Sequence, residues 1–137
     1  MAGTAVLACA AVPLHAQTCI GGDRYVISLT VKNNAIVDPG DAALTGWGTP
    51  TRIVWRSPPG YMFQKGGIAF AADPNGQFSN GHQGDDTAVP PLPAMSRWHH
   101  WCNKNNDHQT HKYTILLFKV SDPTAPPLKL DPNIVNN

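Results

Sequence analysis

KYTILLFKV, residues 112–120, is the longest apolar run of the chain after its first 17 residues. Successive side chains of a strand point to opposite faces, and both faces of this run are apolar: Tyr113, Ile115 and Leu117 on one, and Leu116, Phe118 and Val120 on the other. An apolar run bounded by polar residues on both sides is typical of a strand covered on both faces. We therefore predict a central strand here, around which the rest of the fold is built.

Shorter runs of the same kind precede it, separated by turn residues. Residues 24–32 alternate, and residues 51–56 place Ile53 and Trp55 on one side. The composition of residues 73–93 shifts to Gly, Asn, Asp, Gln and Pro, which predicts a long loop. Short strands of this spacing satisfy their backbones by stacking two sheets. We expect a single all-β domain over residues 18–137, a Greek-key β-sandwich of about seven to eight short strands.

The composition argues against helices and against some partners. All nine acidic residues are Asp, which favours turns and caps, whereas Glu, a good helix former, is absent. The 12 Gly and 13 Pro also favour turns. The net charge of +1 gives no field that would recruit nucleic acid. We expect no nucleic-acid partner.

The start of the chain has the pattern of an export signal. Residues 2–14 are almost all small and apolar, and Ala16 lies near the expected cleavage after Gln17. No Lys or Arg precedes Arg24, which leaves open that a longer leader begins upstream. We expect a signal peptide at residues 1–17, a periplasmic or extracellular location and, because no later run reaches about twenty apolar residues, no membrane span.

Two cysteines remain after this leader, Cys19 and Cys102. In an oxidising compartment such a pair predicts a disulfide. The loop that it closes is long, and a simple chain-entropy model gives about 4 to 5 kcal/mol of stabilisation. We expect this bond to tie the N-terminal edge to the segment that enters the central strand.

Several short motifs together resemble the cupredoxin family. They are Val37-Asp38-Pro39, Gly48-Thr49 and Ile53-Val54-Trp55 near the start, and Lys112-Tyr113-Thr114-Ile115 and Leu130-Asp131-Pro132-Asn133-Ile134-Val135 near the end. The resemblance covers about residues 25–135 and implies a bacterial exported β-sandwich. An immunoglobulin-like sandwich has similar strand spacing and remains the alternative.

The ligands of a blue-copper site are absent from the matching positions. Such a site needs one His after the Trp-bearing strand, then Cys, His and usually Met near the C-terminus. Arg56 to Gly60 contain no His, Leu116 to Phe118 stand where thiolate and imidazole are expected, and no Met follows Met95. We expect no type 1 copper and no resident cofactor.

A histidine-rich segment offers a different metal chemistry. His99, His100, His108 and His111 lie within thirteen residues, beside Cys102. Clustered imidazoles bind zinc or cupric ion. The other interpretation is ordinary polar histidines on a solvated loop over residues 103–110, with His99 and His100 on opposite faces of the strand that precedes it.

Aromatic residues supply the remaining candidate site. Trp98 and Trp101 fall on opposite phases of the same segment, so one is expected to point inward and the other to contribute to a surface for a protein or carbohydrate partner. The residue types of a hydrolytic triad are present in Ser79 or Ser96, His82, and Asp85 or Asp86, but no sequence motif supports such a triad. The sequence favours an exported, non-enzymatic binding or structural module over a metal protein using the histidines.

Overall fold

The computed structural model describes residues 23–44, 48–71, 73 and 76–137. This part of the chain contains thirteen strands and no helix, hence none that could cross a membrane. The strands are β1 (Asp23–Ser28), β2 (Val31–Lys32), β3 (Ala35–Ile36), β4 (Ala42–Leu44), β5 (Thr51–Arg56), β6 (Tyr61–Gln64), β7 (Ile68–Phe70), β8 (Phe78–Gln83), β9 (Met95–Ser96), β10 (Trp98–Asn103), β11 (Thr110–Lys119), β12 (Leu128–Leu130) and β13 (Asn133–Asn136). They exceed the predicted seven or eight because the predicted strand over residues 24–32 is divided into β1 and β2, and because β8, β9 and β12 lie where no strand was predicted.

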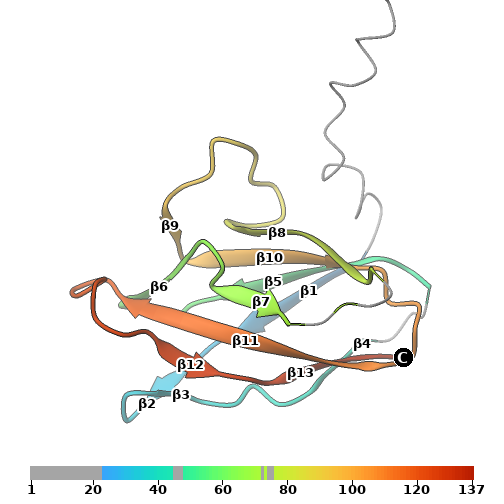
Figure 1. Ribbon diagram of the computed structural model, residues 1–137, viewed down its shortest axis with the longest axis horizontal. Helices are drawn as coiled ribbons and strands as arrows, with labels where there is room; N and C mark the ends of the chain where they lie inside the picture. Colours follow the sequence, from blue (N-terminus) through green and yellow to red (C-terminus); the bar gives the residue numbers. More distant parts are fainter. Residues whose placement is uncertain (1–22, 45–47, 72, 74–75) are drawn as a thin grey trace, which may run out of the picture.

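The strands form two main sheets that pack together, so the prediction of an all-β sandwich is confirmed (Figure 1). The first sheet has the order β1-β5-β10-β8. The second has the order β4-β13-β11-β6-β9, with β7 and β12 also paired to β11. A small hairpin of β2 and β3 lies at one end. Each main sheet contains one parallel pair, β1 with β5 and β13 with β4.

The central strand is β11, as predicted, because it pairs with neighbours along both edges. Its face toward the other sheet carries Tyr113, Ile115 and Leu117, each at most 1% exposed. The opposite face is only partly covered, and Val120 is 50% exposed. The prediction that both faces are buried is therefore wrong for the outer one, since no further layer packs on it in the described part of the chain.

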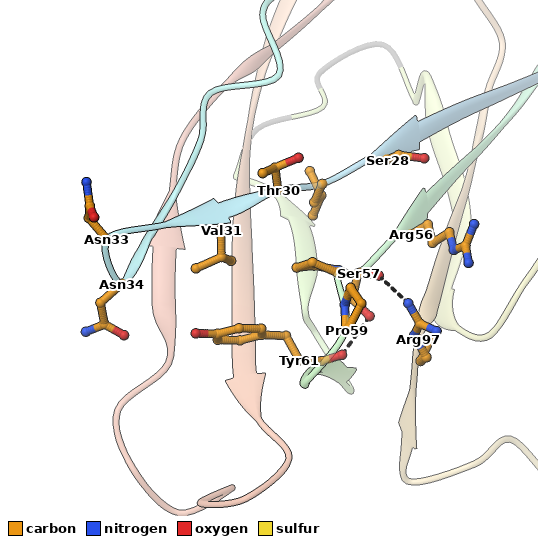
Figure 2. A pocket seen from close by; sticks show the side chains of 12 residues that line it. Ser28, Thr30, Val31, Asn33, Asn34, Arg56, Ser57, Pro59, Tyr61 and Arg97 are labelled. Atoms are coloured by element: carbon orange, nitrogen blue, oxygen red, sulfur yellow. Dashed lines mark hydrogen bonds between the residues drawn. The ribbon is translucent and has the colours of Figure 1, made fainter.

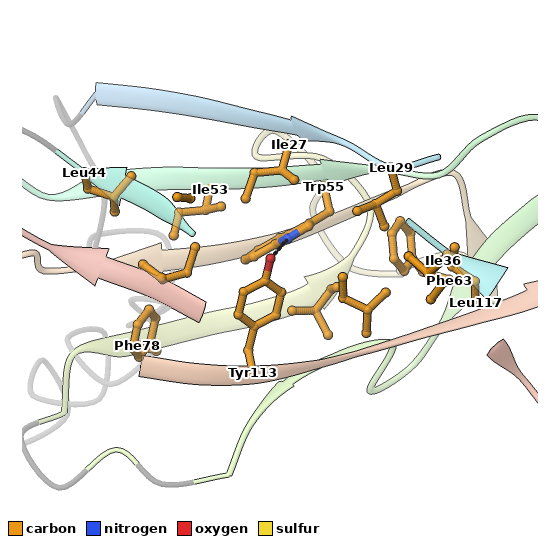
Figure 3. Close-up of a cluster of buried hydrophobic side chains, with 14 residues drawn as sticks. Ile27, Leu29, Ile36, Leu44, Ile53, Trp55, Phe63, Phe78, Tyr113 and Leu117 are labelled. Carbon is orange, nitrogen blue, oxygen red and sulfur yellow. Dashed lines mark hydrogen bonds between the residues drawn. The ribbon is translucent and has the colours of Figure 1, made fainter. Parts of the chain in front are cut away.

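The core lies between the two sheets and is organised around an indole (Figure 3). Trp55 of β5 is fully buried, and its Nε1 donates a hydrogen bond of 3.1 Å to the hydroxyl of Tyr113 on β11. The two rings also contact each other, with centroids 5.3 Å apart. Burial raises the pKa of Tyr113 to about 12, although the bond from Trp55 opposes that shift. The two sheets are thus joined by packing and by a satisfied buried polar pair.

Strand β8 corrects the predicted loop over residues 73–93. The Asp73 carboxylate accepts hydrogen bonds from the backbone N–H groups of Gln77 and Phe78, at 2.7 and 2.9 Å, and so fixes the start of the strand. Gly81 faces the ring of Trp101, where an added Cβ would collide with the indole. The strand forms because β10 pairs with it, not because of an apolar alternation, and its polar composition concealed it.

Removing the Tyr113 hydroxyl should weaken the whole sandwich. In Tyr113→Phe the buried Nε1 of Trp55 loses its acceptor, and we expect the free energy of unfolding to fall by about 1 to 3 kcal/mol. Urea denaturation followed by tryptophan fluorescence measures it. Tyr61→Phe, at a half-buried tyrosine of β6, is the matched control and should cost less than half as much. Equal losses in the two variants would contradict a special role for the buried pair.

Candidate functional site

His99 and His100 point to opposite faces of β10, as expected from strand alternation. His99 faces the core, where its ring meets Phe63 edge-on with centroids 5.7 Å apart. Both ring nitrogens are buried without a hydrogen-bond partner. Burial, reinforced by the nearby His82, lowers the pKa of His99 to about 3. The ring is therefore neutral at physiological pH and acts as a packing group.

His100 lies on the outer face beside His82 of β8. The two ring centroids are 4.9 Å apart. Nδ1 of His100 lies 3.0 Å from the backbone carbonyl of Asn80. Burial lowers the pKa of His100 to about 4, although the Asn80 contact works against the shift. Like His99, this residue is neutral at physiological pH.

The ring of His82 is held by backbone at both nitrogens. Nδ1 lies 2.9 Å from the carbonyl of Asn80, and Nε2 lies 3.0 Å from the carbonyl of Asp85. A neutral imidazole donates from only one of its nitrogens, but in either tautomer a carbonyl oxygen occupies the position from which a metal ion or a serine hydroxyl would approach. In this geometry His82 can be neither ligand nor general base, and the triad considered from sequence does not form around it.

His111 and His108 lie at the other end of the segment. Nε2 of His111 is 2.7 Å from an oxygen of Asp107. Burial would raise the pKa of Asp107, but hydrogen bonds from Asn136, Gln109 and His111 outweigh it and the pKa is lowered. His108 is exposed, with a left-handed backbone at φ 51. The expectation of exposed loop histidines therefore holds for His108 and is wrong for the three buried ones.

The four predicted metal ligands do not converge on one point. His99 points from β10 into the core, and His100 points to the opposite, outer face of the first sheet. His108 and His111 belong to the following turn and strand. No group of three or more His, Cys, Asp or Glu suited to a metal ion occurs among the residues that the structure describes. Metal binding by this segment stays a prediction with no assembled site to support it.

A buried amide network occupies the loop that was expected to be solvated. Asn103 is fully buried and donates to the side-chain oxygen of Asn136 at 2.7 Å. Asn136 donates in turn to Asp107 at 2.9 Å. Gln77 bonds both the side chain and the backbone N–H of Asn106. The prediction of a solvated loop over residues 103–110 is wrong for these amides, because sequence alone does not show that buried polar groups form hydrogen bonds with one another.

The structure describes only one of the two cysteines of the predicted disulfide. Cys102 lies in β10 and is fully buried. Cys19 and the predicted signal peptide at residues 1–17 lie outside the described residues. The bond and the leader therefore remain predictions.

The two tryptophans of β10 have the opposite orientations expected of them. Trp101 points inward, packs edge-on against Phe70 and donates from Nε1 to the carbonyl of Ile68 at 2.8 Å. Trp98 lies on the outer face and is only partly buried. The guanidinium of Arg56 lies 5.5 Å from its ring centroid, within the range of a cation–π contact. Of the pair, Trp98 is the one placed to contribute to a surface.

A groove of about 710 Å³ opens next to this Arg56–Trp98 pair. One rim is the segment from Ser28 to Asn34, which includes β2, and the other runs from Arg56 to Tyr61 and is joined by Arg97. Figure 2 shows Tyr61 and Val31 on facing rims and Arg97 reaching toward Ser57. Sequence reasoning missed this groove because its rims come from three separate parts of the chain.

Arg97 is fixed in place at the groove. One terminal nitrogen of its guanidinium donates to the carbonyl of Ser57 at 3.0 Å. Ser57, itself buried, donates from its hydroxyl to the carbonyl of Tyr61 at 2.7 Å. Arg97 and the turn that carries Pro58 and Pro59 are thus held together. The position of the Arg97 guanidinium is therefore fixed before a ligand binds.

The groove, which we call the arginine groove, has an unbalanced charge. None of its twelve lining residues is acidic, whereas Arg56 and Arg97 are both cationic. The arginines that form ion pairs in the described part of the chain are Arg24 and Arg52, which share Asp86 on the outer face of the first sheet. The chemistry that the arginine groove offers is therefore recognition of an anion by guanidinium groups.

His99 and His100 predict a loss of stability in mild acid. Their folded pKa values lie below the unfolded value of 6.5, so the unfolded state takes up protons first as the pH falls below it. Stability then decreases from about pH 6.5 toward about pH 4, by about 2 kcal/mol per histidine at pH 5. In His99→Leu we expect a visibly shallower decrease between pH 7 and pH 5 in urea denaturation. His108→Asn is the matched control; a His99→Leu variant with the parent's slope would contradict the assignment.

Comparison with known proteins adds no family to this description. No protein-family model matches the chain, and a search of curated proteins finds no match either. The family likeness rests on the short motifs of the sequence, and the chemistry of the site rests on its geometry.

Proposed function

We propose that this protein is an exported, non-enzymatic β-sandwich module, cupredoxin-like but without a blue-copper site, that binds a partner molecule through the arginine groove. The single observation that carries the proposal is the groove itself, where two cationic side chains, one fixed by Ser57, line a concave surface and no acidic residue lines it in the described part of the chain. Polar groups preorganised at a concave surface are typical of binding sites.

Topology supports the cupredoxin-like part over the immunoglobulin-like alternative. Each main sheet contains a parallel pair, β1 with β5 and β13 with β4. The sheets of a constant-type immunoglobulin sandwich are antiparallel. The positions at which a cupredoxin would carry thiolate and imidazole hold Leu116, Leu117 and Phe118, and Leu117 is fully buried in the core. Apolar side chains there support a module that retains the scaffold without the copper chemistry.

The contacts of the histidine rings support a non-enzymatic function over the metal-binding alternative. His99 is a neutral core group, both nitrogens of His82 face carbonyls, and His111 is tied to Asp107. Each is already part of the packing or of a hydrogen-bond network. A zinc or cupric site would need several of these rings to turn toward one point.

The groove should be where small molecules collect on this protein. In two-dimensional NMR titrations with a mixed library of small carboxylates, sugars and aromatics, we expect shifts to concentrate on residues that line it, such as Asn33, Arg56 and Tyr61. Thr30→Trp places a large side chain in the groove and should abolish those shifts, whereas Thr124→Trp, at another exposed threonine, should not. Shifts centred on His82 and His100 in both variants would overturn the proposal.

Metal analysis separates the proposal from its alternative. Protein purified without a histidine tag should contain no stoichiometric transition metal by elemental analysis. In calorimetric titration with Zn²⁺ or Cu²⁺ we expect no affinity tighter than about micromolar, which corresponds to about 8 kcal/mol. One equivalent of bound metal that is lost in His100→Ala or His108→Asn but kept in Lys112→Gln, at an exposed residue that is not a candidate ligand, would establish the metal-binding function instead.

A further inference from the structure

The positive charges of the arginine groove favour a ligand of negative charge. Arg56 and Arg97 form no ion pair with any described residue, and no carboxylate lines the groove to neutralise them. Arg97 keeps a nitrogen of its guanidinium on Ser57, and Arg56 lies against the indole of Trp98. Both side chains are thus restrained at one end. A guanidinium is always charged and binds planar anions, above all carboxylates, through paired hydrogen bonds.

Several backbone groups of the rims are already paired. The carbonyl of Arg56 accepts from the N–H of Leu29 at 2.9 Å, and the carbonyl of Thr30 accepts from the N–H of Val37 at 2.8 Å. The N–H of Ser57 donates to the carbonyl of Arg97, also at 2.8 Å. An extended peptide that binds as an added strand depends on free backbone groups at an edge. The three pairs described here are not available for such a ladder.

Neutral side chains that form hydrogen bonds make up much of the remaining lining. Ser28 and Thr30 contribute hydroxyl groups on one rim, and Asn33 and Asn34 contribute amides at the tip of the hairpin. Both asparagines have left-handed backbones, at φ 52 and 58, a conformation that forms the tight turn and that asparagine tolerates. Their amides donate and accept, which suits the hydroxyl groups of a saccharide.

From this combination we infer that the ligand of the arginine groove is an acidic saccharide whose sugar units carry carboxylates, as in a uronic acid polymer. The inference rests on the proposed binding function. The guanidinium groups of Arg56 and Arg97 bind the carboxylates, and the hydroxyls and amides of the opposite rim bind the sugar hydroxyls. Tyr61 and the ring of Pro59 supply apolar surface for the sugar's C–H face.

Calorimetry with a matched pair of oligosaccharides tests the inference. Trigalacturonate carries three carboxylates, and its fully methyl-esterified form has the same sugar units without the charge. We expect the acidic form to bind at low ionic strength and the neutral form to bind at least tenfold more weakly. The affinity for the acidic form should also fall as salt is raised from about 0.01 to 0.15 M, because ions screen exposed charges.

Arginine variants show whether the carboxylates are bound in the groove. Arg56→Gln and Arg97→Lys should each weaken trigalacturonate binding about tenfold, the second because an ammonium lacks the planar fork of a guanidinium. Lys112→Gln removes an exposed cation that does not line the groove and should leave the affinity unchanged. Thermal unfolding of each variant checks that the sandwich is intact.

Each other outcome overturns the inference in a distinguishable way. Equal binding of the neutral ester would show that the groove binds sugars without regard to charge. Binding of an aspartate-rich peptide, with no binding of trigalacturonate, would assign the groove to acidic proteins; both results leave the proposed binding function standing. An equal effect of Lys112→Gln would show that net charge and not the groove is responsible. Absence of binding by all three probes would overturn the acidic-saccharide assignment. The proposed function itself fails only if the small molecules of the NMR titration do not bind in the groove, or if the protein binds metal.

Discussion

The contact between Trp55 and Tyr113 determines which way the side chains of β5 and of its neighbour β10 point. Because the indole must point inward to reach its hydrogen-bond partner on β11, its neighbour Arg56 must point outward. The register between β5 and β10 pairs Trp55 with His99 and Arg56 with Trp98. His99 is therefore drawn into the core, and Trp98 is placed outside, directly opposite Arg56. One buried polar pair thus explains both the neutral core histidine and the Arg56–Trp98 pair beside the arginine groove.

Much of the sandwich could be predicted because its main strands have an apolar face. β5 and β11 were recognised from Trp55, Tyr113 and their alternating neighbours. β8 was missed because its pairing is determined by Gly81 packing on Trp101 and by Asp73 at its start. The contact of Gly81 with Trp101 joins residues that are distant in sequence, and Asp73 belongs to a polar run. Hydrophobic periodicity detects neither.

The candidate site was less predictable than the fold, for a physical reason. A histidine has the same sequence signature whether it binds metal, packs in a core or contacts a carbonyl, and His99 and His82 differ only in what surrounds them. Trp98 was predicted as a surface residue from the strand phase, which is a local property. The arginine groove joins residues near 30, 57 and 97, and no local pattern brings these three segments together.

The core and the groove impose compatible limits on the pH at which the protein can act. Proton uptake by unfolded histidines weakens the sandwich as the pH falls from about 6.5 toward 4. A carboxylate with an ordinary pKa near 4 also loses its charge only toward the lower end of that range. The two arginines stay charged throughout. An acidic saccharide is therefore largely ionised over the pH range in which His99 and His100 reduce the stability of the sandwich, so mild acid acts first on the folded protein and only at lower pH on the charge of such a ligand.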